Sequence, residues 1–436
     1  MIRRLFFFLF FIATLLVAAC TDNDSFSSSQ ANRLTFSVDT VKFDTLFSTM
    51  PSSTRSFWVY NKSGDGIRIQ TARLERGTQS GYRVNVDGTY LDPVVGDFEV
   101  RKGDSICVFV EVTTRETRQT EPLLMEDNLL FTLESGVEQR VHLSTYSWDA
   151  QRMESLVVHR DTTIESAVPL LVMGDGIRVD SGATLTLRNT ELYFHDGAGI
   201  RVRGQLKAEG CLFRGDRLDR MFTYLPYDRI SGQWEGISIA SSSTDNSFIH
   251  CEIRNAMDAL QCDSTQLTLT DVVIHNNRGY GLRATGAVVT ISYCQMSNTL
   301  GDCLLLEGCE AVVDHTTLAQ FYPFSADRGA ALRFANTAQL PLTLLCTNTL
   351  VTGYEEDVVM GEQTDTLSVF DYRFANCLLR TPEVDDTVRF QRIIWETPKD
   401  SVQGKQHFRT VDEDNLYYDF RIDSISPALA REIGRL

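Results

Sequence analysis

Few residues of this chain stand at spacings that suit catalytic chemistry. Asp258 and Asp302 each lie two residues before a leucine of a repeated pattern, Leu260 and Leu304. Paired carboxylates act as acid and base in glycoside hydrolysis, and carboxylates converging from neighbouring strands bind calcium. If these two residues lie two strands apart in a parallel stack, their carboxylates are separated by about 9.6 Å. This distance is the outer limit for an inverting mechanism. The alternative, which we favour in a chain this acidic, is that both are ordinary surface groups.

The other chemically capable residues lack partners at a useful spacing. His275 and His315 stand singly on predicted strands, where a lone histidine is usually structural. No glycine-rich phosphate loop, serine nucleophile elbow, metal-spaced histidine pair or zinc-type cysteine spacing occurs. We therefore expect no catalytic residue beyond the weak candidates Asp258 and Asp302, no metal and no cofactor. A calcium cofactor is expected only if the protein is a lyase.

Aromatic side chains gather in and beside two segments, 214–233 and 320–330, that interrupt a regular repeat. Long loops on a regular scaffold often carry function, and aromatic faces suit sugar rings. The candidates for ligand contact are Phe222, Tyr224, Tyr227, Trp234 and Tyr322. The alternative is that these segments fold over the scaffold and bury their aromatic rings as a lateral cover.

The elements that must position these residues follow from the repeat. Two columns of apolar residues recur at steps of 21 to 23 residues. The first column is Ile253, Ile274, Met296 and Leu318, and the second is Ile237, Leu260, Leu282 and Leu304. Beyond the second interruption the first column continues at Leu350, 32 residues after Leu318. A period of about 20–25 residues carried by short alternating strands is typical of a stacked β-solenoid.

Two further sets of residues keep this register. Cys211, Cys251 and Cys294 each precede an apolar column position by two residues, where other turns hold Val or Thr. Cysteine there acts as a small inward-facing apolar side chain. The cysteines after Cys20 number nine, so we expect mostly buried free thiols, with a disulfide between some pair as the alternative.

A set of amides follows the first column by two residues. Its members are Asn255, Asn276, Asn298 and Gln320. Because an amide carries both a donor and an acceptor, we expect these side chains to stack as a ladder at a turn. A polar ligand-binding row is the alternative.

Two segments, GATLTLRNTELYFHDGAGIRVRGQLKAEG (182–210) and GQWEGISIASSSTDNSFIHCEIRNA (232–256), resemble right-handed parallel β-helix proteins of the pectate-lyase-like superfamily. The resemblance implies an all-β fold with a right-handed single-stranded parallel β-helix over residues 150–425. Many such proteins act on polysaccharides as calcium-dependent lyases or as hydrolases. Of the polygalacturonase-type motifs, however, only Asp385-Asp386 occurs in this region, without the others.

Residues 34–148 follow a different rule. Short segments such as SFWVYNKS and SICVFVEVTT alternate apolar and polar residues, and turn pairs such as Asp87-Gly88 separate them. This pattern predicts an N-terminal β-sandwich. In architecture it resembles the immunoglobulin-like domains of bacterial surface and periplasmic proteins.

Residues 1–19 have the composition of a secretion signal. Two arginines precede an apolar run that is too short to span a bilayer comfortably. The end of this run, LVAAC, resembles a bacterial lipobox, which implies cleavage before Cys20 and acylation of that residue, a stable anchor of several chains. Residues 20–33 are then a disordered tether, and its two acidic residues loosely resemble the surface-export signal of Bacteroidota lipoproteins. We expect the outer membrane, at either its cell-surface or its periplasmic face.

The formal net charge of −17 argues against nucleic acid and anionic lipid surfaces as partners. We expect a monomer that contacts the membrane through its lipid anchor. The leading hypothesis is a non-catalytic envelope lipoprotein that binds glycan or another envelope component through the β-helix face and its loops. The alternatives are a polysaccharide lyase or glycoside hydrolase of the β-helix class, and a structural or adhesin-like spacer.

Overall fold

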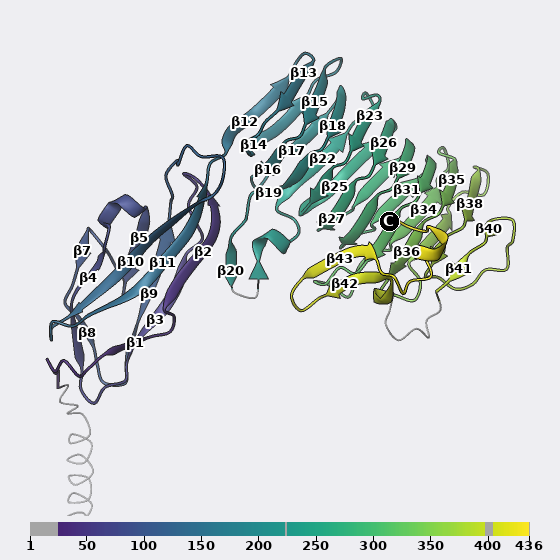
Figure 1. Cartoon of the computed structure of the whole chain (residues 1–436). Coiled ribbons are helices and arrows are strands. Elements are labelled where there is room, and N and C mark those ends of the chain that lie inside the picture. Colours follow the sequence, from purple (N-terminus) through teal and green to yellow (C-terminus); the bar gives the residue numbers. More distant parts are fainter. Residues whose placement is uncertain (1–24, 223–224, 397–403, 436) are drawn as a thin grey trace, which may run out of the picture. The chain divides into compact units, whose positions relative to one another are not determined.

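The computed structural model contains little regular structure besides β-strands (Figure 1). The residues that it describes are 25–222, 225–396 and 404–435. Cys20 and Tyr224, singled out in the sequence, lie outside these ranges, so the lipidation site and one aromatic candidate have no structural description. No helix within the described ranges is long and apolar enough to cross a membrane.

Residues 25–117, together with 122–148, form the sandwich unit. Its five-stranded sheet has the order β1 (Leu34–Phe36), β3 (Arg55–Asn61), β9 (Ser105–Val112), β5 (Tyr82–Val86) and β6 (Thr89–Tyr90). Its six-stranded sheet has the order β2 (Thr40–Phe47), β11 (Glu138–Trp148), β10 (Leu123–Leu133), β4 (Ile67–Leu74) and β7 (Val94–Val95), with β8 (Phe98–Val100) beside β4. Alternation places every second side chain of β9 in the core between the sheets, as the sequence predicts for a β-sandwich.

Residues 118–121, 149–396 and 404–435 form the coil unit, whose main part is a right-handed single-stranded parallel β-helix. Its ten-stranded sheet has the order β13 (Thr162–Glu165), β15 (Thr184–Arg188), β18 (Gln205–Glu209), β23 (Asn246–Ile249), β26 (Gln266–Thr270), β29 (Val288–Ser292), β32 (Glu310–Asp314), β35 (Leu342–Thr347), β38 (Phe370–Ala375) and β40 (Phe390–Gln391). Successive coils therefore stack in register through parallel hydrogen bonds.

An eighteen-stranded sheet closes each coil with two further strands. It begins with the long strands β12 (Gln151–Val158) and β14 (Leu170–Val179). The first series is β16 (Glu191–Phe194), β19 (Leu212–Gly215), β24 (Glu252–Arg254), β27 (Val273–Asn277), β30 (Gln295–Thr299), β33 (Thr317–Gln320), β36 (Leu350–Gly353), β39 (Leu378–Leu379) and β41 (Ile394–Trp395). The second series is β17 (Gly199–Val202), β22 (Trp234–Ile239), β25 (Ala256–Asp263), β28 (Leu282–Thr285), β31 (Leu304–Glu307), β34 (Leu332–Asn336) and β37 (Val359–Gln363).

Strand pairing confirms both predicted apolar columns. Ile253, Ile274, Met296 and Leu318 are successive partners in the first series, and Ile237, Leu260, Leu282 and Leu304 in the second. All of these side chains lie in the core, at most 1% exposed. The next partner of Leu318 is Val351, one residue beyond the Leu350 that the spacing suggests.

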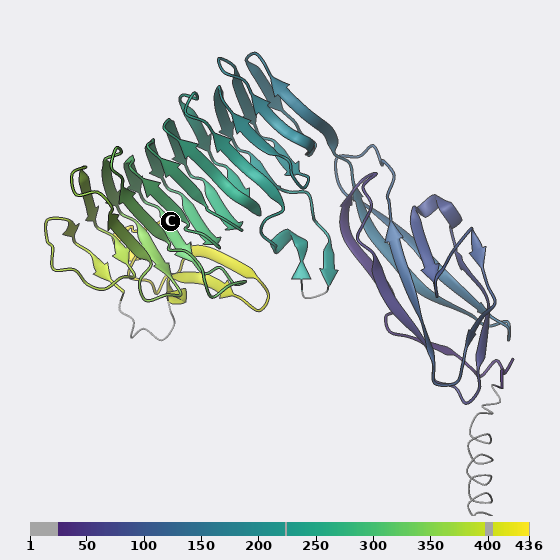
Figure 2. The ribbon, with the colours of Figure 1, turned by 180° about the vertical axis from the view of Figure 1, so that it is seen from behind.

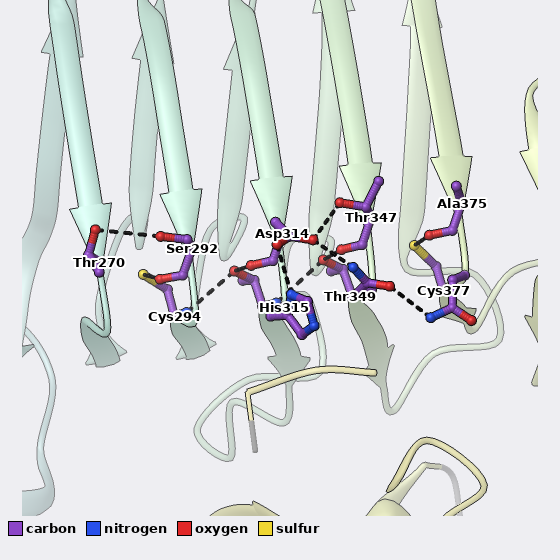
Figure 3. A network of polar contacts seen from close by, with 12 residues as sticks. Thr270, Ser292, Cys294, Asp314, His315, Thr347, Thr349, Ala375 and Cys377 are labelled. Carbon is purple, nitrogen blue, oxygen red and sulfur yellow. Dashed lines mark hydrogen bonds and ion pairs between the residues drawn. The ribbon is translucent and has the colours of Figure 1, made fainter. Parts of the chain in front are cut away.

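A turn that follows most strands of the ten-stranded sheet explains four of the cysteines, Cys211, Cys251, Cys294 and Cys377. The turn residue is left-handed in Tyr293, His315 and Asn376, and a buried Cys or Thr follows it. Cys294 Sγ donates to the carbonyl of Ser292 at 3.2 Å, and Thr316 Oγ1 and Cys377 Sγ make the same bond two residues back (Figure 3). All nine described cysteines are free, and eight are buried. In the turns of the ten-stranded sheet, the thiol therefore serves as a compact donor that bridges its own turn.

The predicted amide ladder is largely wrong. Asn276 Nδ2 lies 3.4 Å from Asn255 Oδ1, but Asn298 Oδ1 instead accepts the backbone N–H of Phe321 at 3.2 Å. Gln320 Nε2 donates to backbone carbonyls, including that of Gly301 at 3.0 Å. Asn255 lies between β24 and β25, whereas Asn276 and Asn298 lie within β27 and β30. All three adopt left-handed backbone conformations, which asparagine tolerates better than most residues.

The coils end at Trp395, before the expected boundary at 425. The chain then turns back along the coils as η3 (Lys405–His407), β42 (Phe408–Asp412), β43 (Tyr417–Ile422) and η4 (Leu429–Arg431). The antiparallel hairpin β42–β43 packs Phe408, Phe420 and Ile422 onto Phe321 and onto the outer side of the first series. Figure 2 shows this hairpin in yellow against the coils.

Candidate functional site

A groove lies on the outer face of the first strand series, where segments distant in sequence meet. Its floor is the solvent side of β24, β27 and β30, and hairpin β42–β43 forms a wall. Arg229, from the short helix η2 (Tyr227–Arg229), and Pro323 also line it. The cavity measures about 440 Å³. The two segments at which the repeat fails thus border one cavity, together with the hairpin.

The floor is polar because it uses the strand positions that alternate with the core. Ile274 is buried inside the coil, while its neighbours Val273 and His275 face outward. Strand pairing places Arg254 beside His275, and His275 beside Ser297. Polar side chains therefore follow one another along the stack at about 4.8 Å, the spacing of paired strands.

His275 is a neutral hydrogen-bonding group in this floor. Its Nδ1 lies 3.0 Å from Ser297 Oγ, and the rings of Tyr418 and Phe420 stand 5.8 Å and 6.0 Å away. Burial beneath these rings, and then the charge of Arg254, lower the pKa of His275 to about 3. The imidazole therefore stays uncharged at neutral pH and does not repel the neighbouring guanidinium of Arg254.

Guanidinium groups dominate the charge of the lining. Arg254 Nη1 lies 3.3 Å from Glu252 Oε1, and Arg421 Nη2 lies 2.5 Å from Asp419 Oδ2. The Nε of Arg254 is buried and has no hydrogen-bond partner within the described ranges. A ligand oxygen in the groove would satisfy this donor, whose burial without a partner is costly.

The rim pairs a cation with an exposed aromatic ring. The guanidinium of Arg229 stands 6.0 Å from the ring centroid of Tyr417 and donates to the carbonyl oxygen of Asn415 in the hairpin turn. Tyr417 is 51% exposed. Its ring face is therefore available to a planar or cyclic ligand.

Hydrogen bonds join the two interruptions to each other and to the coils. Ser231 Oγ and Tyr322 OH lie 2.8 Å apart, which links one interruption to the other. Asn276 Nδ2 donates to the carbonyl of Arg229 at 2.8 Å, which fixes the rim to the floor. The groove is thus built from mutually supported segments.

A buried ionic cluster holds the hairpin segment against the last coils. Arg380 Nη1 lies 3.0 Å from Glu396 Oε1, and both side chains are 2% exposed. Thr352 Oγ1 donates to Glu396 Oε2 at 2.6 Å, and His407 Nε2 lies 3.5 Å from the same oxygen. His407 begins the return of the chain toward β42, so the cluster positions the wall of the groove.

The predicted catalytic carboxylates lie outside the lining of this groove, and both cap backbone groups of the next coil. Asp258 Oδ1 accepts the N–H of Tyr280 at 2.8 Å. Asp302 Oδ1 accepts the N–H of Ala330 at 2.6 Å, and its Oδ2 lies 3.0 Å from Arg333 Nε. These contacts are structural, and no acid–base pair follows from them.

The aromatic candidates divide between core and cover. Trp234 is 1% exposed, stacks on Phe194 at 4.3 Å and donates to the carbonyl of Arg254 at 2.9 Å. Its indole is therefore a core side chain and is not available to a ligand. Tyr322 is 4% exposed, and Tyr227 lies under the guanidinium of Arg217 at 3.9 Å.

These placements agree with a lateral cover rather than with an exposed sugar platform. The side chain of Phe222 has no structural description. The groove residues Tyr417 and Arg254 were not predicted from the sequence, because neither stands in a recognisable motif. The one available signal was the position of the two interruptions.

The groove lining offers binding groups and no evident catalytic pair. A glycosidase acid needs a raised pKa. Hydrogen bonds from Arg421 instead lower the pKa of Asp419, despite its partial burial, and the other lining carboxylate, Glu252, contacts Arg254. No three His, Cys, Asp or Glu side chains gather as a metal site in the part of the chain that the structure describes.

Comparison with known families agrees with this architecture. Residues 153–318 match the family described as the right-handed β-helix region. This stretch is a right-handed β-helix. No curated protein matches the chain.

Three solved structures align with the chain, each with weak similarity. The catalytic unit of a family 87 α-1,3-glucanase from Streptomyces thermodiastaticus aligns over 78% of this chain and 88% of its own, with 8% identity and a TM-score of 0.20. A family 123 glycoside hydrolase from Clostridium perfringens aligns over 29% of this chain and 31% of its own, with 7% identity and a TM-score of 0.20. A PapD-like domain of human CEP192 aligns over 27% and 87%, with 11% identity and a TM-score of 0.18. Alignments this weak establish neither ancestry nor activity.

Proposed function

We propose that this protein is an envelope-anchored lipoprotein that binds a glycan chain in the groove without turning it over. The observation that carries the proposal is the convergence of both interruptions and the hairpin on one cavity of about 440 Å³ with an exposed tyrosine at its rim. Sugar rings present apolar faces and hydroxyl edges. Tyr417 supplies a stacking surface for the first, and Arg254, His275 and Gln295 supply hydrogen-bonding groups for the second.

The proposal includes the anchor and the sandwich unit. Lipidation at Cys20, as in lipoproteins of the Bacteroidota type, would hold the protein at the outer membrane, on its surface or its periplasmic face. The sandwich unit, in the role of an immunoglobulin-like domain, would then follow the tether in the chain and precede the coil unit. Replacement of Cys20 by alanine tests this part. Loss of partition into a detergent phase supports the anchor, and unchanged partition contradicts it.

The groove is tested with the protein from Thr21 onward and a panel of immobilised neutral and acidic polysaccharides. We expect retention on at least one polysaccharide and loss of that retention in Tyr417→Ala, because the variant removes the exposed ring without touching the core. Tyr146→Ala is the matched control, since Tyr146 is an exposed tyrosine (44%) on β11 of the sandwich unit.

Three outcomes contradict the proposal. The first is no retention on any polysaccharide, and the second is equal loss in both variants. The third is the appearance of new reducing or unsaturated ends, with or without calcium, which would show that the groove is an active site.

A further inference from the structure

A second cavity adjoins the groove along the coil stack. It measures about 330 Å³ and is lined by residues of β19 and β24 and of the turns beside them, including His250 and Asp271. Both cavities share Glu252, Val273 and Arg435 in their linings. The two spaces are therefore neighbours, and the side chain of Arg435 stands at their boundary.

The side chain of Arg435 is held at this boundary by one ion pair. Its Nε and Nη2 lie 2.9 Å and 2.7 Å from Asp271 Oδ1. The backbone is fixed independently, because the N–H of Arg435 donates to Thr317 Oγ1 at 3.0 Å and the N–H of Gly434 donates to the carbonyl of Asn348 at 2.7 Å. The side chain is thus free to be changed without releasing the segment that carries it.

The two cavities follow the axis along which the coils stack. Gln295, Val273 and Glu252 are successive partners on β30, β27 and β24 and line the first cavity. The partner of Glu252 on β19 is Leu212, and the next partner, on β16, is Glu191; both line the second cavity. At about 4.8 Å per strand, the first cavity covers two steps, about 10 Å, and the two together cover four steps, about 19 Å.

We infer that Arg435 sets the length of ligand that the groove accepts, by dividing a continuous binding track at the level of Asp271. The inference rests on the proposed glycan binding and deepens it. With Arg435 paired to Asp271, a ligand fills the first cavity alone. With the pair opened, a longer chain continues over β19 toward β16 and gains contacts there.

The test uses size-fractionated oligomers cut from a polysaccharide that the panel retains, with binding measured by calorimetry. We expect Arg435→Ala to raise the affinity for the longest oligomers about tenfold relative to the affinity for the shortest binders, because only long chains reach the second cavity. Asp271→Asn keeps Arg435 and weakens its ion pair. This variant should shift the affinity for the longest oligomers in the same direction by a smaller factor.

Arg431→Ala is the matched control, because this arginine lies on the same returning segment and contacts the carbonyl of Arg392 away from the groove. It should change neither length class. A uniform loss of affinity at all lengths in Arg435→Ala would identify the residue as a ligand contact and overturn the inference, and unchanged binding at every length would do the same. Failure of wild-type binding altogether would instead refute the proposed function, so the two failures are distinguishable.

Discussion

Glu396→Gln should destabilise the coil unit far more than the loss of an ordinary ion pair. In the folded protein Arg380 and Glu396 are 2% exposed and 3.0 Å apart, so the substitution leaves a buried guanidinium without its counter-charge. Breaking a buried pair in this way costs about 3–5 kcal/mol. Thr352 Oγ1 also loses a charged acceptor. Because the glutamine amide still offers one oxygen, we expect the lower end of this range, about 3 kcal/mol.

The protein contains its own control for this prediction. Arg68 and Glu99, on the sandwich unit, are also 3.0 Å apart, but they are 46% and 48% exposed. Exposed pairs contribute about 0–1 kcal/mol, so Glu99→Gln should shift the unfolding transition little. The two ion pairs have the same length and differ in exposure, so the difference between the two variants measures the effect of burial.

Urea unfolding followed by fluorescence measures both changes, since Trp395 adjoins the buried site and Trp58 and Trp148 lie in the sandwich unit. Hydrogen exchange at β42 and β43 reports whether the hairpin segment is released first. Equal shifts in Glu396→Gln and Glu99→Gln would refute the reasoning. The double variant Arg380→Met with Glu396→Leu should recover much of the loss, because it leaves no buried charge unpaired.

Three other substitutions test the roles of individual side chains by urea unfolding or thermal melting. Trp234→Ala should cost about 3–5 kcal/mol and leave glycan retention intact, because it empties a core site; lost retention at wild-type stability would contradict this. Cys294→Thr should stay within about 1 kcal/mol of wild type, since a hydroxyl also donates to the carbonyl of Ser292, whereas Cys294→Val should lose more. Asp302→Ala should cost about 1–3 kcal/mol by leaving the N–H of Ala330 unpaired, and a neutral result would show that water replaces the carboxylate.

The coil register was predictable because its partners are close in sequence. Each residue of the column from Ile253 to Leu318 pairs with one a single coil away, so a fixed period encodes the contact. The predicted partner of Leu318 was wrong by one residue at β36, which an interruption precedes. Leu350 and Val351 are adjacent and both apolar, and the period alone cannot choose between them.

The groove was predictable only in part. The interruptions marked the place, because a segment that breaks the period must leave the stack. Which side chains they expose was not encoded locally: Trp234 opens strand β22 and turns inward. The wall was missed because Tyr417 and Arg254 line one cavity from positions more than 160 residues apart, with no repeat to connect them.

The cluster that fixes this wall also predicts how the protein responds to acid. Burial raises the pKa of Glu396, but His407, Thr352 and Arg380 together outweigh it, and the net pKa lies below the ordinary value of 4.5. A carboxyl whose pKa is lowered by folding stabilises the protein fully above its unfolded pKa, and this contribution disappears as the pH falls through the folded value. The difference in unfolding free energy between wild type and Glu396→Gln should therefore persist down to about pH 5 and shrink below about pH 4.5. Because the contributions of the other acidic groups cancel when the unfolding free energy of the variant is subtracted, the difference reports Glu396. A difference that persists to pH 3 would show that the charge of Glu396 does not hold the hairpin segment.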